Sequence, residues 1–446
     1  MHTHLIQRTT WRACIRIAPM QNVRIPIPHD TSVPVQSGDR RRARFLSTRP
    51  LMRAWMLLLV CLLPLTAIAQ DHMAAMAPTA MSQHPTLGAT AAFDTSGRLW
   101  LVDAMGGHVR LRYSDDLGKT LSAPVNVNAQ AEAIYATADN RPKIAIGAHD
   151  ELYVSWSEML AKKFTGFVRF SRSLDGGKHF STPINVHHDR AETTHGFDAL
   201  AVDGQGRVMV AWIDKRARIA ALAEGKPYAG SGIYYSWSND KGASFVTERK
   251  LIDHSCECCR IVLARAPNGE VAAFFRSISG DNIRDHAYGV LPADGRKVHV
   301  ERATFNQWHI AGCPEQGPGL MIGADGTRHA VWYESKDRPT IWYGQLDPGH
   351  PPRHARVVAT LGASHADVTV AGKAVWITWN QIDAQGFSLM ARHSIDGGLH
   401  FDEARQLATA TGAAGSPQWV MRGSQPYVAW NTSDGFRLIS VGGKAR

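Results

Sequence analysis

Short apolar runs separated by turn residues recur along residues 89–441, and this pattern predicts β-strands. Seven times the chain repeats an apolar strand, a turn with Gly or Asp, and a second apolar strand that commonly ends in Trp. The strand pairs lie at residues 91–93 with 99–102, 144–146 with 153–156, 200–202 with 208–212, 262–264 with 271–275, 320–322 with 330–332, 368–370 with 375–379, and 419–421 with 427–430. Each unit has room for four strands, so the pattern predicts an all-β protein, a β-propeller with seven blades.

The last unit differs from the others because it offers only three strands, the third at residues 436–441. We therefore expect the segment near residues 84–90 to supply a fourth strand and close the ring. The Trp residues that end the second strands are expected to fill the core between blades, because large aromatic side chains dominate such contacts.

A second repeat marks the turns. Four eight-residue stretches share the pattern Ser-x-Asp-x-Gly-x-x-Phe, the first of them loosely, and their Asp residues are Asp116, Asp175, Asp240 and Asp396. A short Ser or Asp side chain accepts hydrogen bonds from backbone N–H groups of its own turn, and Gly supplies a positive φ. The pattern therefore predicts four structural turns and no catalytic role for these carboxylates.

This turn pattern resembles the Asp box of the sialidase-like (BNR-repeat) β-propellers, and the resemblance extends over residues 89–441. In that family the box lies between the third and fourth strands of a blade, away from the active face. The family usually has six blades, so the resemblance implies a six-bladed ring as the alternative to the seven units counted here.

The first 69 residues are expected to lie outside the propeller. Residues 56–69 form an apolar run that ends in small residues, which predicts a secretory signal peptide cleaved before Gln70. The run is too short for a membrane span, and the long basic stretch before it favours Met52 as the start of translation. We therefore predict a periplasmic or secreted protein with no membrane span in its mature form.

Removal of this leader changes the charge of the protein. Residues 1–69 hold ten of the 49 Lys and Arg and two of the 39 Asp and Glu, which leaves 39 basic and 37 acidic residues. A nearly neutral chain gives no electrostatic reason to expect nucleic-acid binding. Residues 70–88 are rich in Met and His and are interpreted as an arm before the propeller domain at 89–446; soft-metal binding by this arm is the alternative.

Candidate ligands gather in the linkers that join one predicted blade to the next. Cys256, Cys258 and Cys259 lie in the linker into the fourth blade, and Cys313 lies in the linker into the fifth. Loops of the same regions add His254, His286 and His309. Because linkers of neighbouring blades meet on one face of a propeller, these side chains are expected to lie close together.

Two chemical states suit this set of residues. In an oxidising compartment, Cys313 is expected to form a disulfide with Cys256, Cys258 or Cys259. Alternatively, thiolates gathered with imidazoles bind a soft metal, with copper preferred and zinc next. The sequence leaves both states open.

The sialidase resemblance implies a different site. That family binds a carboxylated sugar with three Arg residues and uses a Tyr nucleophile with a Glu partner. Arg141, Arg276 and Arg284 are the positions here that match the clamp, Glu257 matches the Glu, and no Tyr stands in a matching motif. The first hypothesis is therefore a non-hydrolytic protein that binds a small molecule, glycan or soft metal; the alternative is an exo-sialidase or related glycoside hydrolase.

Overall fold

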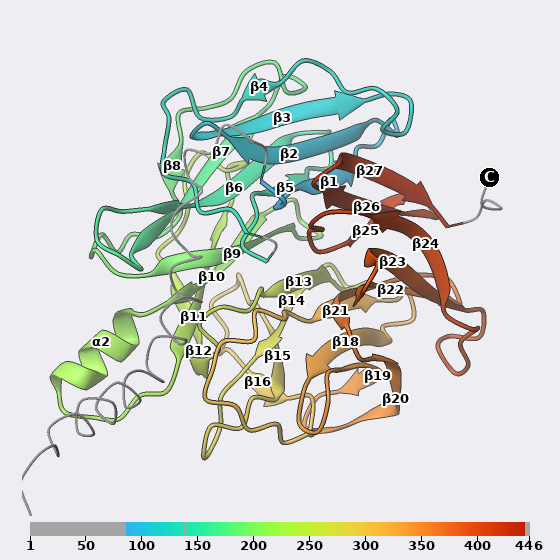
Figure 1. Ribbon diagram of the computed structural model, residues 1–446. Helices are drawn as coiled ribbons and strands as arrows, with labels where there is room; N and C mark the ends of the chain where they lie inside the picture. The colour runs from blue at the N-terminus through green and yellow to red at the C-terminus, as the bar shows by residue number, and fades with distance from the viewer. Residues whose placement is uncertain (1–85, 138, 442–446) are drawn as a thin grey trace, which may run out of the picture. The chain divides into compact units, whose positions relative to one another are not determined.

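The computed structural model describes residues 86–137 and 139–441. These residues form seven antiparallel sheets, six with four strands and one with three. The seven-bladed β-propeller predicted from the strand pairs is therefore confirmed (Figure 1). The predicted leader and signal peptide, at residues 1–69, and most of the arm at 70–88 lie outside the described residues.

Within each blade the strands follow one another in chain order from first to last. The first strands are β1 (Thr90–Phe93), β5 (Lys143–Ile146), β9 (His195–Val202), β13 (Val262–Arg265), β17 (Gly319–Ile322), β21 (Ala363–Ala371) and β25 (Gln418–Arg422). The second strands are β2 (Leu99–Met105), β6 (Leu152–Met159), β10 (Val208–Asp214), β14 (Val271–Arg276), β18 (Arg328–Glu334), β22 (Ala374–Asp383) and β26 (Gln425–Thr432).

The third strands are β3 (His108–Ser114), β7 (Gly166–Ser173), β11 (Ser231–Ser238), β15 (His286–Val290), β19 (Thr340–Asp347), β23 (Gly386–Ser394) and β27 (Gly435–Ser440). The fourth strands are β4 (Val125–Asn126), β8 (Ile184–Asn185), β12 (Arg249–Ser255), β16 (Val300–Arg302), β20 (His350–Thr360) and β24 (Arg405–Ala410). The first strands contact one another in sequence from β1 to β25, and β25 contacts β1. These contacts close the ring and place the first strands around its axis.

The core lies between neighbouring blades, where apolar side chains from two sheets meet. Trp156, Trp212, Trp379 and Trp430 lie within the second strands of their blades and are almost completely buried. They belong to the apolar clusters that join successive blades. The Trp residues therefore form core between blades, as expected from their regular position in the repeat.

The prediction that the segment near residues 84–90 supplies a fourth strand to the last blade is wrong for the described residues. The seventh sheet contains only β25, β26 and β27, and residues 86–89 form no strand; residues 84 and 85 lie outside the described part. The segment is tied down in another way, because Asn431 Nδ2 donates to the Thr86 carbonyl oxygen at 2.9 Å. Residue Gly88 passes so close to Thr137 that a Cβ there would lie 2.3 Å from its carbonyl oxygen. Residues 86–89 therefore pass between blades and do not pair as a strand within any blade.

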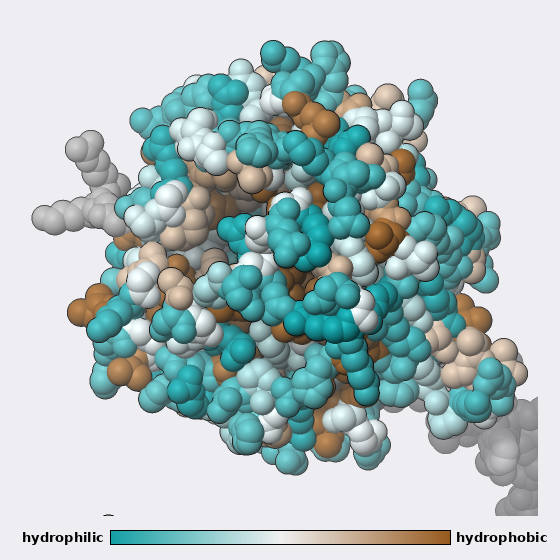
Figure 2. Space-filling model, turned by 180° about the vertical axis from the view of Figure 1, so that it is seen from behind, coloured by the Kyte–Doolittle hydropathy of each residue, from teal (hydrophilic) through white to brown (hydrophobic). Residues whose placement is uncertain are grey.

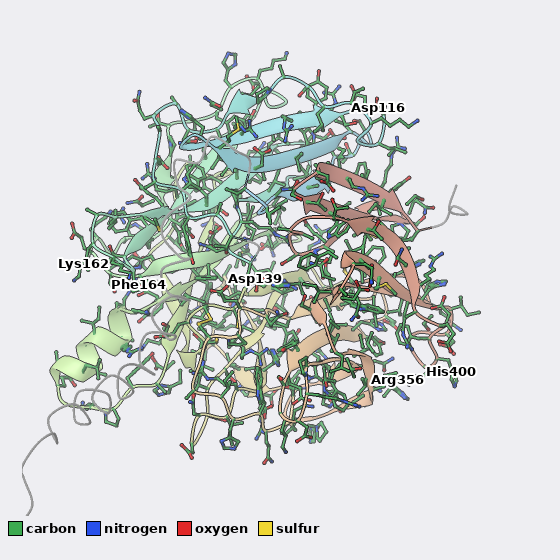
Figure 3. All side chains as sticks on the ribbon, in the orientation of Figure 1. Asp116, Asp139, Lys162, Phe164, Arg356 and His400 are labelled. Carbon is green, nitrogen blue, oxygen red and sulfur yellow. A yellow bond between two sulfur atoms is a disulfide. The ribbon has the colours of Figure 1, made fainter. Side chains whose placement is uncertain are left out.

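All four Ser-x-Asp-x-Gly turns lie between the third and fourth strands of their blades. In each, the Ser hydroxyl donates to the Asp carboxylate and accepts a hydrogen bond from the Gly N–H at 2.7 to 2.9 Å. The apolar residue that ends each turn packs in the core shared with the neighbouring blade. Figure 3 shows Asp116, on one of these turns, at the rim of the ring, and Asp139 near its middle. These turns are structural.

Replacing Ser173 with Ala is expected to lower the free energy of unfolding by about 1–2 kcal/mol, because the N–H of Gly177 loses its acceptor. Gly177 is buried, has a φ of +78°, and leaves no room for a Cβ beside Leu111 and Trp100. Urea unfolding followed by Trp fluorescence measures the change. Ser433→Ala, at an exposed turn, is the control and should change stability by less than about 0.5 kcal/mol. Equal stability of the two variants would contradict the structural role.

Helix α2 (Arg216–Ala223) is the only helix in the described part of the chain and joins β10 to β11. Within residues 86–137 and 139–441, no helix has the length and apolar character that crossing a membrane requires. The face shown in Figure 2 is mostly hydrophilic, with apolar residues scattered among polar ones. Most large apolar side chains of the described residues lie in the clusters between blades.

Candidate functional site

The three neighbouring cysteines follow β12 in the linker that leads into the fourth blade. The linker is held against β14, because the N–H of Cys256 donates to the Arg276 carbonyl oxygen at 2.9 Å. Cys256, Cys258 and Cys259 are buried in the apolar cluster shared by the third and fourth blades. The linker therefore points its sulfur atoms inward.

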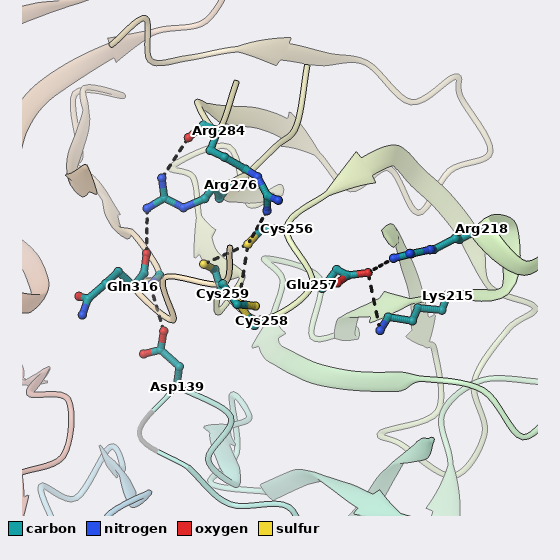
Figure 4. Close-up of a disulfide and its surroundings, with 12 residues drawn as sticks. Asp139, Lys215, Arg218, Cys256, Glu257, Cys258, Cys259, Arg276, Arg284 and Gln316 are labelled. Carbon is teal, nitrogen blue, oxygen red and sulfur yellow. Dashed lines mark hydrogen bonds and ion pairs between the residues drawn. A yellow bond between two sulfur atoms is a disulfide. The ribbon is translucent and has the colours of Figure 1, made fainter. Parts of the chain in front are cut away.

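The four cysteines are divided into one disulfide and two thiols. Cys258 is bonded to Cys313, which lies on the linker into the fifth blade, and their Cα atoms are 6.1 Å apart. Cys256 and Cys259 are free, with their Sγ atoms 3.3 Å apart, and Cys256 Sγ lies 3.9 Å from Cys258 Sγ (Figure 4). Cys313 is exposed. Of the two states left open by the sequence, the structure contains the disulfide, and it still leaves two thiols beside it.

Arg276 supplies a positive charge next to this group. Its side chain is 1% exposed, its amino groups donate to the carbonyl oxygens of Arg284, Gln316 and Tyr333, and its guanidinium lies 5.0 Å from the ring centre of Trp308. No carboxylate of the described residues forms an ion pair with it. A buried cation without an acidic partner favours a nearby anion.

One candidate for that anion is the sulfur of Cys256, because the positive charge of Arg276 helps to lower its pKa. Arg284 Nη1 donates to Cys256 Sγ at 3.5 Å. The hydrogen bond with Cys259 and the charge of Arg276 lower the pKa of Cys256 to about 6, although burial acts in the opposite direction. That hydrogen bond and burial raise the pKa of Cys259 well above its ordinary value. These surroundings therefore favour ionisation of Cys256 over that of Cys259.

A charged network at the axis connects this linker to the rest of the ring. Arg260, next to Cys259, donates to Asp139 Oδ1 at 3.0 Å and to the Ala366 carbonyl oxygen at 2.8 Å. Asp139 also accepts from the N–H of Gly317 at 3.0 Å. Burial opposes ionisation of Asp139, but the charge of Arg260, other nearby positive charges and the hydrogen bond from Gly317 together outweigh burial, so the pKa of Asp139 is lowered. The network therefore holds the cysteine linker in a defined position.

The three candidate histidines lie apart from the sulfur group. His254 Nδ1 lies 3.1 Å from the Ala229 carbonyl oxygen, and His309 is exposed. His286 is buried, its Nε2 has no hydrogen-bond partner among the described residues, and burial lowers its pKa well below the ordinary value. Two groups of possible ligand atoms within 4.8 Å of one another occur among the described residues: the sulfurs of Cys256, Cys258 and Cys259, which none of these histidines joins, and a separate group of Asp189, His195 and Asp214.

The residues matched to a sialidase clamp have separate partners. Arg141 donates to the Ser416 carbonyl oxygen at 2.8 Å, Arg276 to the three carbonyls named above, and Arg284 to Asn282 and Cys256. Glu257 points away toward α2, where it pairs with Arg218 and with Lys215 at 3.6 Å (Figure 4). In the structure, the guanidinium groups of Arg141 and Arg276 are directed at protein carbonyls.

Two acidic residues of the site were missed by the sequence interpretation. Asp139 directly precedes the Asn140-Arg141 pair, and Asp367 stands between the apolar residues Ala366 and Val368 at a first strand. Asp367 Oδ2 accepts from the Trp419 N–H at 2.9 Å, so it joins the sixth blade to the seventh. An acidic residue within an apolar inner strand is the signal that would have indicated this role.

Comparison with known proteins supports the fold. No family model and no curated protein matches the sequence. Among solved structures, an ulvan lyase is 10% identical with a TM-score of 0.52, over 81% of this chain and 95% of that chain. The polysaccharide lyase Uly1 is 8% identical with a TM-score of 0.51, over 82% and 91%. The Hadza microbial sialidase Hz136 is 14% identical with a TM-score of 0.45, over 77% and 76%. At these identities the lyases show a similar fold alone.

Proposed function

We propose that this protein is an exported, non-hydrolytic binding protein that holds one soft metal ion, preferably Cu(I) and alternatively Zn(II), through the thiolates of Cys256, Cys258 and Cys259. The observation that carries this proposal is the buried group of three sulfur atoms within 4.8 Å of one another. Thiolates are the ligands that select Cu(I) and Zn(II) over harder ions.

The spacing of the sulfurs suits a single ion. Metal–sulfur bonds of about 2.3 Å place three sulfur ligands about 4 Å apart. The distance from Cys256 Sγ to Cys258 Sγ is 3.9 Å, and that from Cys256 Sγ to Cys259 Sγ is 3.3 Å. Of these two distances, the second must widen for both sulfurs to bind one ion.

The surrounding charge also favours a metal bound by thiolates. Three thiolates with Cu(I) carry a net charge of −2, and a buried anion requires a compensating cation. Arg276 is buried and has no acidic partner among the described residues, and Arg284 already donates to Cys256. These two guanidinium groups supply the opposite charge from outside the ligand set.

Metal binding by all three cysteines requires reduction of the disulfide between Cys258 and Cys313. Cys258 is bonded to Cys313 in the structure, so only two thiols are free until that bond is reduced. Cys313 is exposed and lies outside the sulfur group, so we leave it out of the ligand set, together with His254, His286 and His309.

The alternative, a glycoside hydrolase acting on anionic sugars, is less well supported. A carboxylate clamp needs guanidinium groups whose donors are free for the substrate. Arg276 directs both amino groups at protein carbonyls, Arg141 donates to Ser416, and Glu257 faces α2. We therefore assign the axial face to binding and propose no hydrolytic step.

The proposal predicts that fully reduced protein binds one Cu(I) per chain. Anaerobic titration against a chromophoric Cu(I) chelator measures the affinity of the wild type and of three variants. Cys256→Ser and Cys259→Ser each remove a thiolate and should weaken binding by at least about 100-fold. Cys313→Ser, the matched control, should bind as tightly as reduced wild type. Equal affinity of Cys256→Ser and wild type would show that the sulfur group is not the site.

A further inference from the structure

One thiol of the buried pair lies beside a disulfide that reaches the surface. Cys256 Sγ is 3.9 Å from Cys258 Sγ, the buried sulfur of the disulfide. The other sulfur belongs to Cys313, which is exposed and lies 55 residues further along the chain. Cys313 is absent from the group of sulfurs that lie within 4.8 Å of one another, so Cys256 approaches the disulfide from the Cys258 side.

We propose that Cys256 attacks Cys258, so that the protein interconverts two disulfide isomers and presents Cys313 as a reactive thiol on its surface. This activity goes beyond metal binding, because it takes place in metal-free protein in which the disulfide is intact. It also explains why two thiols stand next to a disulfide in a protein whose blades already supply an extensive core.

The exchange is balanced without another reactant. The Cys256 thiolate donates an electron pair to Cys258 Sγ, and a bond between these two sulfurs forms. The bond between Cys258 and Cys313 breaks, and its electron pair leaves on Cys313 Sγ as a thiolate that takes a proton from water. One disulfide exists before and after the step, so nothing is oxidised or reduced overall.

The surroundings make Cys256 the nucleophile of the pair. Its sulfur accepts a hydrogen bond from Arg284 Nη1 at 3.5 Å and shares another with Cys259 Sγ at 3.3 Å, and it lies 3.9 Å from the disulfide sulfur of Cys258. The buried Arg276 adds a positive charge and forms no ion pair with a carboxylate of the described residues. Thiolates beside Arg residues are the reactive cysteines of proteins.

The same surroundings set the direction of the equilibrium. Once Cys256 is bonded to Cys258, Arg276 and Arg284 lose their anionic neighbour, so the isomer in the structure is favoured at rest. Cys313 is already exposed in the isomer that the structure contains, and a reagent that consumes its thiol draws the exchange forward. The chemical class of partner is therefore a thiol-reactive or disulfide-bearing molecule that meets Cys313 at the surface.

Peptide mapping tests the proposal in native, metal-free protein without reductant. The protein is incubated with iodoacetamide at neutral pH, quenched with acid and digested with trypsin without reduction. Residues 251–260 carry Cys256, Cys258 and Cys259 on one tryptic peptide, and residues 303–328 carry Cys313 on another. In the original isomer the two peptides are linked. In the exchanged isomer they separate, with a label on Cys313 and a peptide 251–260 that has lost two hydrogens.

We expect wild type to accumulate separate, Cys313-labelled peptide with time. Cys256→Ser should form it at least about tenfold more slowly, whereas the matched Cys259→Ser variant, which keeps the nucleophile, should form it readily. Near-ultraviolet circular dichroism checks that each variant is folded. The result for the wild type does not depend on the folding of the variants. Labelling of Cys256 while all chains keep the bond between Cys258 and Cys313 would overturn the proposal. It would leave the metal site untouched, because copper binding is measured on reduced protein.

Discussion

Replacing Asp139 with Ala is expected to lower the free energy of unfolding by about 3–5 kcal/mol, because it leaves a buried cation without its partner. Asp139 accepts hydrogen bonds from Arg260 at 3.0 Å, from the N–H of Gly317 at 3.0 Å and from Ser416 at 3.3 Å. These contacts join a linker of the second blade to linkers of three others. Urea unfolding at neutral pH measures the loss.

Asp115→Ala is the control for this prediction, because Asp115 forms an exposed ion pair with Arg98 and its removal should cost less than about 1 kcal/mol. The difference between wild type and Asp139→Ala should also depend on pH. The pKa of Asp139 is lowered in the folded protein, so its contribution is present above the unfolded-state pKa of about 3.9 and is lost as the pH falls. A difference that stays constant down to pH 2 would contradict this account.

Replacing Arg276 with Met is expected to weaken Cu(I) binding by about 10- to 100-fold while leaving all three sulfur ligands in place. The reason is the charge of the complex: three thiolates around Cu(I) remain anionic in a buried site, and Met fills the space of Arg without compensating that charge. The stacking of Arg276 on Trp308 should be partly preserved, because Met also packs well against an aromatic ring. The chelator competition described for the wild type measures the affinity.

Arg249→Met provides the matched control. Arg249 belongs to β12, the strand that leads into the cysteine linker, and it also donates to backbone carbonyl oxygens, those of Pro292 and Arg296. Its substitution should leave the affinity for Cu(I) within about twofold of wild type, since no charge near the sulfurs changes. If both variants bind equally, the positive charge of Arg276 does not stabilise the metal site.

Much of the propeller could be predicted because its determinants are local. The strand pairs from residues 91–93 to 427–430 all correspond to first and second strands of blades, and the four Ser-x-Asp-x-Gly turns lie where the third strand meets the fourth. Each of these features depends on residues within one turn or one hairpin. Identification of the chain as a sialidase-like repeat protein, by contrast, stays a prediction, because no family model matches it.

The way in which the ring closes was predicted wrongly, and helix α2 was not predicted. The seventh blade keeps three strands, and residues 86–89 instead meet distant groups such as Asn431. Helix α2 consists of good helix formers but buries none of its residues, so the alternation of apolar and polar positions gave no indication of it. Both features depend on contacts made only after the blades assemble.

The composition of the candidate site could be read from the chain, because Cys256, Cys258, Cys259 and Cys313 all lie in predicted linkers. Their pairing could not, since three neighbouring cysteines have nearly the same loop to close with Cys313. Tertiary structure selects Cys258 for the disulfide and places Cys256 near Arg276 and Arg284. It also brings Asp139, from the other side of the ring, to Arg260. Such choices depend on the relative positions of side chains from different blades, which the assembled ring determines and a local pattern does not.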